Sequence, residues 1–410
     1  MNELGLVLYI IFTISWFLHL GTRIPILGII RFDLILVILL IIISYINRNI
    51  DNEYDKTEVD SSLIILIAYS IITLPLAEWP GSVIRYGIPN FIKAVVFYYF
   101  TIIFITNEKK LKLFIFVYLI CQTYRVIEPL YLHITSGYWG SFASMEGGEV
   151  LLRLSGGPSD TINPNGLAAV IVTIIPFYYF LSELTWKNKI ILVTLLPVFI
   201  YALLLTASRS AMIGLAIILM GIIYLSKKRY LIMALTIIAF FIIFPNLSPD
   251  QQDRYLSIFQ SNTKNAATAE GRLTGTLSTM KLILHKPIIG HGLGTSAEAN
   301  ANYGNMPMAL MPHNLFIEVG IELGLIGLIL FLKFMKSIIM NYLRCYKMLK
   351  IKYSKGFLMK INEAMLILLL LNIVMSFASY GLNLPGWYLF AGLSVVIMRI
   401  SKKQEYEIIE

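Results

Sequence analysis

Four basic residues, drawn from four separate stretches of the chain, are the side chains best suited to chemistry. They are Arg153 in RLSGGPSDTINPNG, Arg209 in TASRSA, Arg272 in AEGRLTG and His313 in MPHNLFIE. A guanidinium group stays charged, and its planar fork binds two phosphate oxygens at once. An imidazole at the water boundary can act as a general base near neutral pH, within reach of a hydroxyl. The four residues therefore predict a surface that handles an anion.

The composition indicates which elements position these residues. Hydrophobic residues make up 57% of the 410 residues, charged residues only 14%, and the mean hydropathy is +0.75. These values are far from those of a soluble domain. A helix needs about 20 apolar residues to span a bilayer, and we expect an all-α integral membrane fold with about 12 transmembrane helices. The apolar segments are residues 4–20, 32–46, 62–77, 88–105, 111–132, 165–184, 190–206, 210–225, 230–245, 313–334, 363–381 and 384–398.

Lysine-rich connections give the expected orientation. Basic residues cluster at 109–112, 187–189, 227–229 and 333–360, and again after the last segment. All of these connections are even-numbered, so both termini are expected in the cytoplasm. The first apolar segment lacks a basic region before it and a small-residue cleavage site, so it is expected to be a helix and not a signal peptide. Cys121 and Cys345 then face different environments and are not expected to pair.

The arginines are distributed differently from the lysines. Eight of the arginines fall in the outer connections or towards the outer ends of the apolar segments, and so do all five histidines. The topology rule places basic residues on the cytoplasmic side, so the outer arginines have another role. They could bind an anionic ligand or merely contact lipid headgroups. The outer arginines are Arg23, Arg31, Arg85, Arg125, Arg153, Arg209, Arg254 and Arg272.

Two outer connections are too long to be simple turns. Directly after the connection 133–164, Asn165 is expected to cap the next helix, and the amides at that helix start would favour an anion. The connection 246–312 is expected to contain an amphipathic helix over residues 269–285, whose leucine and methionine stripe has helical spacing. The GHGLG run at 290–294 is expected to be a tight turn or hinge, more than a phosphate loop.

Three further features concern the outer ends of the helices. Arg209 joins two apolar segments through almost no loop, so it either snorkels to the headgroups or faces a polar partner. Arg125 and Glu128, three residues apart, are expected to form an internal salt bridge. His313 follows Pro312 at the start of a helix and either acts as a base or caps that helix. The secondary site candidates are Glu318, Asn314, His291 and Arg85.

Taken in order, four segments resemble the O-antigen ligase and O-antigen polymerase superfamily of bacterial envelopes. These segments are RLSGGPSDTINPNGLA, LLTASRSA, EGRLTGTLSTMKLILHKPIIGHGLG and PHNLFIEVGIELGLIGLILF. The resemblance covers residues 150–335. It implies a membrane-embedded glycosyltransferase that takes glycan from an undecaprenyl-diphosphate carrier at the periplasmic face. By resemblance, Arg153, Arg209 and Arg272, with Asn165, would bind the diphosphate, and His313 would activate or orient the acceptor.

The resemblance and the residues together define the expected protein. Residues 1–149 would carry the first five transmembrane helices, 150–335 the ligase-like or polymerase-like core, and 336–410 a basic cytoplasmic loop and the last two helices. We expect a multi-pass protein of the bacterial inner membrane. Its expected partners are the lipid-linked glycan, a glycan acceptor, the bilayer and a chain-length regulator, without nucleic acid.

Several points of chemistry remain open at this level. The catalytic set would be His313, Arg209 and Arg272, without a cofactor or metal, because no Asp-x-Asp motif or His/Cys cluster lies in an outer connection. An outer acid could replace His313 as the base. These acids are Glu146, Glu149, Asp160 and Glu318. The Ile/Lys/Asn-rich composition favours a polymerase of O-antigen, capsule or exopolysaccharide. The alternatives are a ligase that delivers glycan to the lipid A core and, from another class, a transporter or lipid-glycan flippase.

Overall fold

A helix lies at each of the twelve predicted apolar segments. The computed structural model describes residues 2–47, 56–144, 150–257, 275–304, 312–352, 356–379 and 381–406. The helices at these segments are α1 (Asn2–Leu18), α4 (Phe32–Asn47), α5 (Glu58–Ile72), α7 (Ile88–Phe104), α8 (Glu108–Ser136), α9 (Pro164–Ser182), α10 (Trp186–Leu205), α11 (Arg209–Leu225), α12 (Arg229–Ile243), α16 (Leu315–Lys352), α17 (Phe357–Met375) and α18 (Pro385–Tyr406).

Length and hydropathy identify this chain as a helical membrane protein. Within the described ranges, seven helices are long and apolar enough to cross a membrane, and three shorter apolar helices coincide with α1, α4 and α11. Helix α12 has no buried residue at all, as expected of a helix that faces lipid on most sides. The exact number of twelve crossings stays a prediction.

Short elements connect the long helices. They are α2 (Leu20–Arg23), α3 (Pro25–Ile29), η1 (Leu74–Leu76), α6 (Pro80–Ser82), the π-helix η2 (Val83–Gly87), η3 (Phe244–Asn246), α13 (Pro249–Leu256), η4 (Lys281–Leu284) and α15 (Ser296–Tyr303). Helix α13 begins with a capping box, in which Ser248 accepts from the Gln251 amide and the Gln251 side chain accepts from the Ser248 amide. Pro249 at the first helical position fits this start.

The structure is mainly helical, as predicted, and the described residues add one short pair of strands to it. Strands β1 (Gly140–Ser144) and β2 (Val150–Leu154) form an antiparallel hairpin in the connection after α8, with Ser141 opposite Arg153. Along β2, Leu151 and Arg153 are buried whereas Val150 and Leu152 are exposed. Strands of five residues carry only two or three side chains per face, which is too short for the alternation to be distinctive in the sequence.

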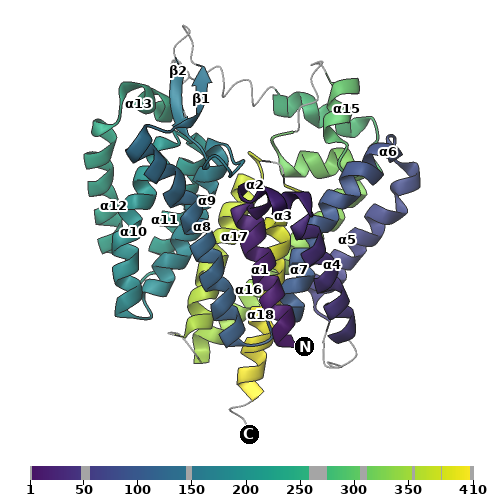
Figure 1. Cartoon of the computed structure of the whole chain (residues 1–410), viewed down its shortest axis with the longest axis horizontal. Coiled ribbons are helices and arrows are strands. Elements are labelled where there is room, and N and C mark those ends of the chain that lie inside the picture. Colours follow the sequence, from purple (N-terminus) through teal and green to yellow (C-terminus); the bar gives the residue numbers. More distant parts are fainter. Residues whose placement is uncertain are drawn as a thin grey trace.

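The long helices pack around α16. Helices α5, α17 and α18 contact α16 directly, α7 packs along α18, and α9 joins α17 to α10 and α11. Figure 1 shows both termini at one end of this bundle, and the hairpin, α13 and α15 at the other. The segments predicted to be outer connections therefore gather at a common end.

Helix α16 is broken at Gly324, whose φ of 68° and ψ of −172° are non-helical. The carbonyls of Ile321 and Glu322, next to the break, accept hydrogen bonds from the amides of His291 (2.8 Å) and Gly292 (2.9 Å). The Leu325 amide donates to the carbonyl of Pro287 at 2.7 Å. The backbone groups released by the break are thus satisfied by the segment 287–292, as an apolar environment requires.

The GHGLG run is the tight turn that the sequence predicted. Gly290, Gly292 and Gly294 have φ values of 72°, 125° and 76°, a region that favours glycine. A Cβ on Gly290 would lie 2.5 Å from the backbone of Glu322 and Gly324. The turn therefore docks against the broken helix at backbone distance, which only glycine permits.

Candidate functional site

The turn between α10 and α11 is the point at which several arginines meet. Arg153 on β2 donates from Nε to the carbonyl of Thr206 at 2.9 Å, and Arg254 on α13 donates from Nε to the carbonyl of Ala207 at 2.7 Å. Arg209 is the first residue of α11. We call Arg153, Arg209 and Arg254 the arginine hub. It joins three segments that lie far apart in the sequence.

Local structure explains why the hub forms at this turn. The connection has only three residues, and Ala207 adopts a φ of 46°, which is uncommon for a residue with a side chain. The last carbonyls of a helix lack partners within it and carry partial negative charge. Arg153 and Arg254, both buried, supply donors and positive charge to the carbonyls that follow α10. Two members of the hub therefore also hold this turn in place.

Asn165 lies beside Arg153, but in a different role from the one predicted. Its Oδ1 accepts from Nη2 of Arg153 at 2.9 Å and from Oγ of Ser208 at 3.0 Å. The cap of α9 is Asn163, whose Oδ1 accepts from the amide of Gly166 at 2.9 Å, with Pro164 at the first helical position. The prediction of Asn165 as the cap is wrong, because the helix starts at Pro164, two residues earlier than a cap at Asn165 would allow.

Arg209 is half-buried, and its Nη1 donates to Oγ of Ser257 at 2.9 Å. The Ser257 hydroxyl donates in turn to the carbonyl of Arg254 at 2.7 Å. These described bonds of the hub go to carbonyl, amide and hydroxyl oxygens, which are uncharged acceptors. These bonds hold three guanidinium groups close together at one turn, and this concentration of positive charge can attract an anion.

Arg254 was missing from the predicted site. The sequence contained a usable signal, because Ser248 and Gln251 have the spacing of a capping box and predict a helix that carries Arg254. Next to it, burial raises the pKa of Tyr255 to about 12, and its hydroxyl donates to the carbonyl of Leu204 at 3.3 Å. This phenol is therefore a neutral donor that further fixes α13 on the end of α10.

Arg272 lies outside the described residues, as does the first part of the predicted amphipathic helix. The described part is helical over 275–280 and continues as η4. Leu277, Met280 and Leu284, the described members of the predicted apolar stripe, are all exposed. An exposed apolar stripe suits a helix that rests on the membrane surface.

His313 is exposed and lies at the junction of two helices. The Asn314 side chain accepts from the amides of Phe316 (2.9 Å) and Ile317 (3.1 Å), so it caps α16. The Leu315 amide donates to the carbonyl of Ser376 at the end of α17, at 2.8 Å. Capping is thus performed by Asn314, which leaves His313 in front of the helix.

Arg209 and His313 lie at the same end of α17. Helix α11 packs on α17, and a Cβ on Gly214 would lie 3.0 Å from Cδ1 of Leu371. Arg209 precedes this contact by just over one helical turn. The structure therefore brings Arg153, Asn165 and Arg209 into one cluster and puts His313 at the neighbouring helix end.

Glu318 is buried one turn into α16. Its Oε2 accepts from the amides of Gly381 (2.7 Å) and Leu382 (3.2 Å). It also lines a small pocket of about 140 Å³. The lining residues are Tyr86, Asn90, Gly294, Glu318, Gly381, Asn383 and Leu384. The buried Oδ1 of Asn383 has no hydrogen-bond partner among the described residues. A carboxyl group, amides and an aromatic ring are the groups that bind sugar hydroxyls.

His291 and Arg85, the remaining secondary candidates, differ sharply. His291 is buried, its Nδ1 lies 2.6 Å from Oε2 of Glu78, and its Nε2 lies 3.2 Å from the carbonyl of Leu282. Both ring nitrogens are occupied, so His291 holds the glycine turn in place and has no free nitrogen for proton transfer. Arg85 is exposed on η2.

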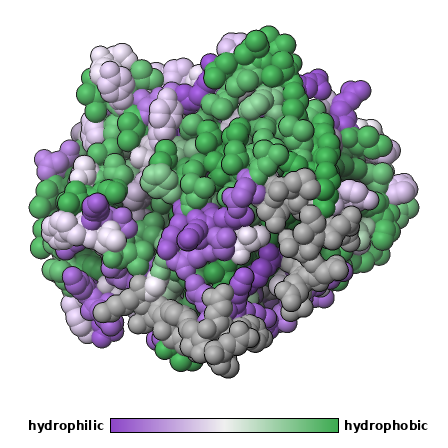
Figure 2. Space-filling view, turned by 60° about the horizontal axis from the view of Figure 1, so that its bottom comes forward, coloured by the Kyte–Doolittle hydropathy of each residue, from purple (hydrophilic) through white to green (hydrophobic). Residues whose placement is uncertain are grey.

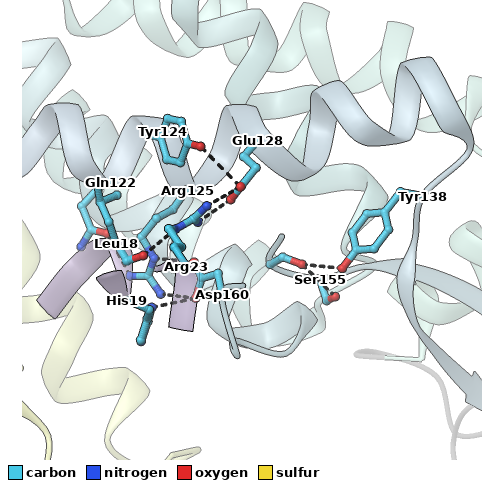
Figure 3. A network of polar contacts seen from close by, with 11 residues as sticks. Leu18, His19, Arg23, Gln122, Tyr124, Arg125, Glu128, Tyr138, Ser155 and Asp160 are labelled. Atoms are coloured by element: carbon cyan, nitrogen blue, oxygen red, sulfur yellow. Dashed lines mark hydrogen bonds and ion pairs between the residues drawn. The ribbon is translucent and has the colours of Figure 1, made fainter. Parts of the chain in front are cut away.

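A second network of arginines replaces the predicted salt bridge between Arg125 and Glu128. Figure 3 shows Arg125 paired with Asp160, with Nε to Oδ2 at 2.6 Å and Nη2 to Oδ1 at 3.0 Å. Glu128 accepts instead from both terminal nitrogens of Arg23. Residues three apart on a helix can pair, but these long-range partners form forked, two-bond pairs, which are stronger. We call these four residues the paired network.

The paired network also excludes one of the four candidate acids as the base. Asp160 is buried in the forked pair, and Nδ1 of His19 lies 3.3 Å from its Oδ1. An acid held in this way supports the loop 155–163 and is not available as a base. Glu146 and Glu149 lie outside the described residues. Cys121 and Cys345 are free, and both are buried; Cys345 lies within α16 and not in a loop.

Comparison with known proteins agrees with the motifs. Residues 190–332 match a family model described as O-antigen ligase. A protein of Rickettsia conorii named "Putative polysaccharide ligase" is 41% identical over 69 residues, which are 14% of this chain and 17% of that protein. A protein of Rickettsia felis with the same name is 28% identical over 157 residues, 34% of this chain and 38% of that protein. The chain thus spans well under half the length of these curated relatives. The matched segment includes Arg209, Arg272 and His313, and the chain is confirmed to resemble the O-antigen ligase and polymerase superfamily.

Proposed function

We propose that this protein transfers glycan from a polyprenyl-diphosphate carrier to a hydroxyl of a glycan acceptor, without a metal ion. The observation that carries the proposal is the arginine hub, in which three guanidinium groups from β2, α11 and α13 meet at one turn. Displacement of a lipid diphosphate from an anomeric carbon develops negative charge on the leaving group. Preorganised guanidinium groups stabilise that charge.

The chemical step has a simple balance. The acceptor oxygen forms a bond to the anomeric carbon while the bond from that carbon to the diphosphate oxygen breaks. The electron pair leaves with the diphosphate, next to Arg209 and Arg272. The acceptor proton passes to a base, for which His313 is the first candidate because it is exposed in front of α16. Arg153 and Asn165 hold the turn and the phosphate side of the site.

Glu318 is the second candidate for the base. It lines the small pocket together with Asn90 and Asn383, groups that could position an acceptor sugar. One observation argues against Glu318 as the base: its Oε2 already accepts hydrogen bonds from two backbone amides. We therefore assign proton transfer to His313 and acceptor positioning to Glu318. His313→Ala and Glu318→Gln separate these roles, because only loss of a base changes the pH dependence of transfer.

The site would face the periplasm in the bacterial inner membrane. In support, β2 and α13, which carry Arg153 and Arg254, lie at the end opposite both termini in Figure 1, and the lysine-rich connections favour a cytoplasmic location of those termini. The lipid-linked glycan, the glycan acceptor and a chain-length regulator would meet the protein at this end.

Polymerase and ligase differ only in the acceptor. The composition favours a polymerase, whereas the name of the matched family and the names of the relatives favour a ligase. A transporter or flippase is the third candidate, favoured by the break in α16, since transporters use broken helices. The backbone groups at that break form hydrogen bonds with the segment 287–292. They are therefore not available to bind a substrate or an ion.

Deletion of the gene and electrophoresis of the surface polysaccharide distinguish the candidates. Products with a single repeat unit identify a polymerase. Free lipid-linked polymer with a bare core identifies a ligase. Lipid-linked repeat units that accumulate in the cytoplasm identify a flippase and would refute the proposed transfer reaction.

A further inference from the structure

A second pocket lies at the opposite end of the bundle, near both termini. Its volume is about 550 Å³, within the range of small-molecule sites. It is formed by the start of α5, the middle of α16 and the last turns of α18. The lining residues are Lys56, Thr57, Glu58, Val59, Ser337, Asn341, Arg344, Lys347, Met348, Met398 and Lys402. None of them belongs to the arginine hub or its surroundings.

The described lining of this pocket is mainly basic. It includes four basic side chains, those of Lys56, Arg344, Lys347 and Lys402, and one acidic side chain, that of Glu58. Glu58 lies 3.2 Å from Nη2 of Arg344, and both side chains are more than half exposed. An exposed pair of this kind binds weakly, so it leaves most of the positive charge available to a ligand.

The other side chains that line this pocket are partly polar and partly apolar. Ser337 and Asn341 add hydroxyl and amide groups inside, whereas Val59, Met348 and Met398 are apolar. Above Glu58, the flank of α5 exposes Ile64 and Ile65. Figure 2, which brings this end forward, shows a hydrophilic patch bordered by apolar flanks. A ligand with a phosphate group, a polar linker and hydrocarbon chains matches this arrangement.

We propose that this pocket binds the phosphate headgroup of an anionic phospholipid. The basic side chains would contact the phosphate, Ser337 and Asn341 the glycerol, and the acyl chains would run along the apolar flank of α5. Basic pockets between membrane helices bind acidic headgroups in this way. The proposal is independent of the glycan-transfer reaction, because the two sites share no residue.

The test uses the full-length protein, purified in detergent and titrated with phosphatidylglycerol or with phosphatidylcholine. Native mass spectrometry counts the bound lipids. The pocket variant carries Lys56→Gln, Arg344→Gln, Lys347→Gln and Lys402→Gln. A matched control carries Lys187→Gln, Lys189→Gln, Lys227→Gln and Lys228→Gln, four exposed lysines of other connections. Both lose four positive charges, so only the location of the charge differs.

We expect the wild type and the control to retain phosphatidylglycerol, and the pocket variant to bind it about tenfold or more weakly. Equal loss in both variants would overturn the proposal, because it would indicate general attraction and no site. Displacement of the lipid by millimolar inorganic phosphate would assign the pocket to a soluble anion and would also overturn it. If the fourfold variant does not fold, Lys347→Gln against Lys187→Gln gives the same comparison.

Discussion

The arginine hub and the paired network use the same residue type at neighbouring positions, yet their arginines are arranged in different ways. In the paired network, Arg125 and Arg23 each meet a carboxylate, Asp160 and Glu128, in a forked pair. In the hub, Arg153 and Arg209 donate to carbonyl, amide and hydroxyl oxygens. The paired network joins opposite charges two by two, whereas the hub gathers like charges at one turn.

This difference indicates that the position of an arginine alone does not show its function. A neutralised, buried pair fixes one segment on another, as the pair of Arg125 and Asp160 fixes the loop 155–163 on α8. The hub instead brings three guanidinium groups from three segments to one turn. It is therefore the better candidate for an anionic ligand, and the paired network has the properties of a scaffold.

The largest effect is expected from breaking the paired network. Arg125→Ala leaves Asp160 buried without its partner, which should lower the free energy of unfolding by about 3–5 kcal/mol. Thermal unfolding of the purified protein measures this loss. The double variant Arg125→Met, Asp160→Leu should recover much of the stability and retain glycan transfer. Loss of transfer in a stable double variant would contradict a purely structural role.

Substitution of an arginine proposed to bind the diphosphate should lower activity and leave the fold intact. Arg209→Ala and Arg272→Ala should lower transfer by about 10²–10³-fold, the usual effect of removing one transition-state donor, while the protein still inserts into the membrane. Arg209→Lys keeps a charge but loses the fork, so it should restore only part of the activity. Surface polysaccharide on a gel, with protein level as the control, reports both. Normal product from both alanine variants would refute the diphosphate role.

The glycine turn offers a smaller effect that separates shape from charge. Gly290→Ala would force a Cβ against the backbone of Glu322 at a φ of 72°, which should destabilise the protein by about 2 kcal/mol. Gly81→Ala is the matched control, because nothing lies within 4 Å of its Cβ position. Unfolding midpoints compare the two. Equal midpoints would show that the turn tolerates a side chain.

The smallest effect concerns pH. Burial alone would raise the pKa of Glu78, but hydrogen bonds from Tyr303 and His291 outweigh it and hold this pKa below its ordinary value of 4.5. A lowered folded-state pKa contributes stability above the ordinary pKa, and this contribution is lost as the pH falls through the folded value. Glu78→Gln should therefore reduce the drop in unfolding midpoint between about pH 5 and pH 3. An unchanged drop would remove Glu78 from the account.

The sequence predicted those parts of the fold and site that depend on local patterns. Apolar run length located every long helix, and the GHGLG spacing predicted the tight turn. Partners distant in the sequence were not predictable: Arg125 pairs with Asp160 and Arg23 with Glu128, although Arg125 and Glu128 are near neighbours in the sequence. Nor could the sequence show that Arg254 joins Arg153 at the turn after α10, because that meeting depends on how β2 and α13 pack. The cap of α9 could have been predicted from the sequence. Pro164 favours the first helical position and therefore indicates Asn163, and not Asn165, as the cap.

The most direct test of the hub is its affinity for undecaprenyl diphosphate, measured on purified protein by titration. The comparison uses the wild type, Arg209→Gln and the double variant Arg125→Met, Asp160→Leu. Loss of one charged donor should weaken binding by about tenfold or more in Arg209→Gln, and the double variant should bind like the wild type. Equal affinity in all three proteins would contradict the claim that the hub binds the diphosphate.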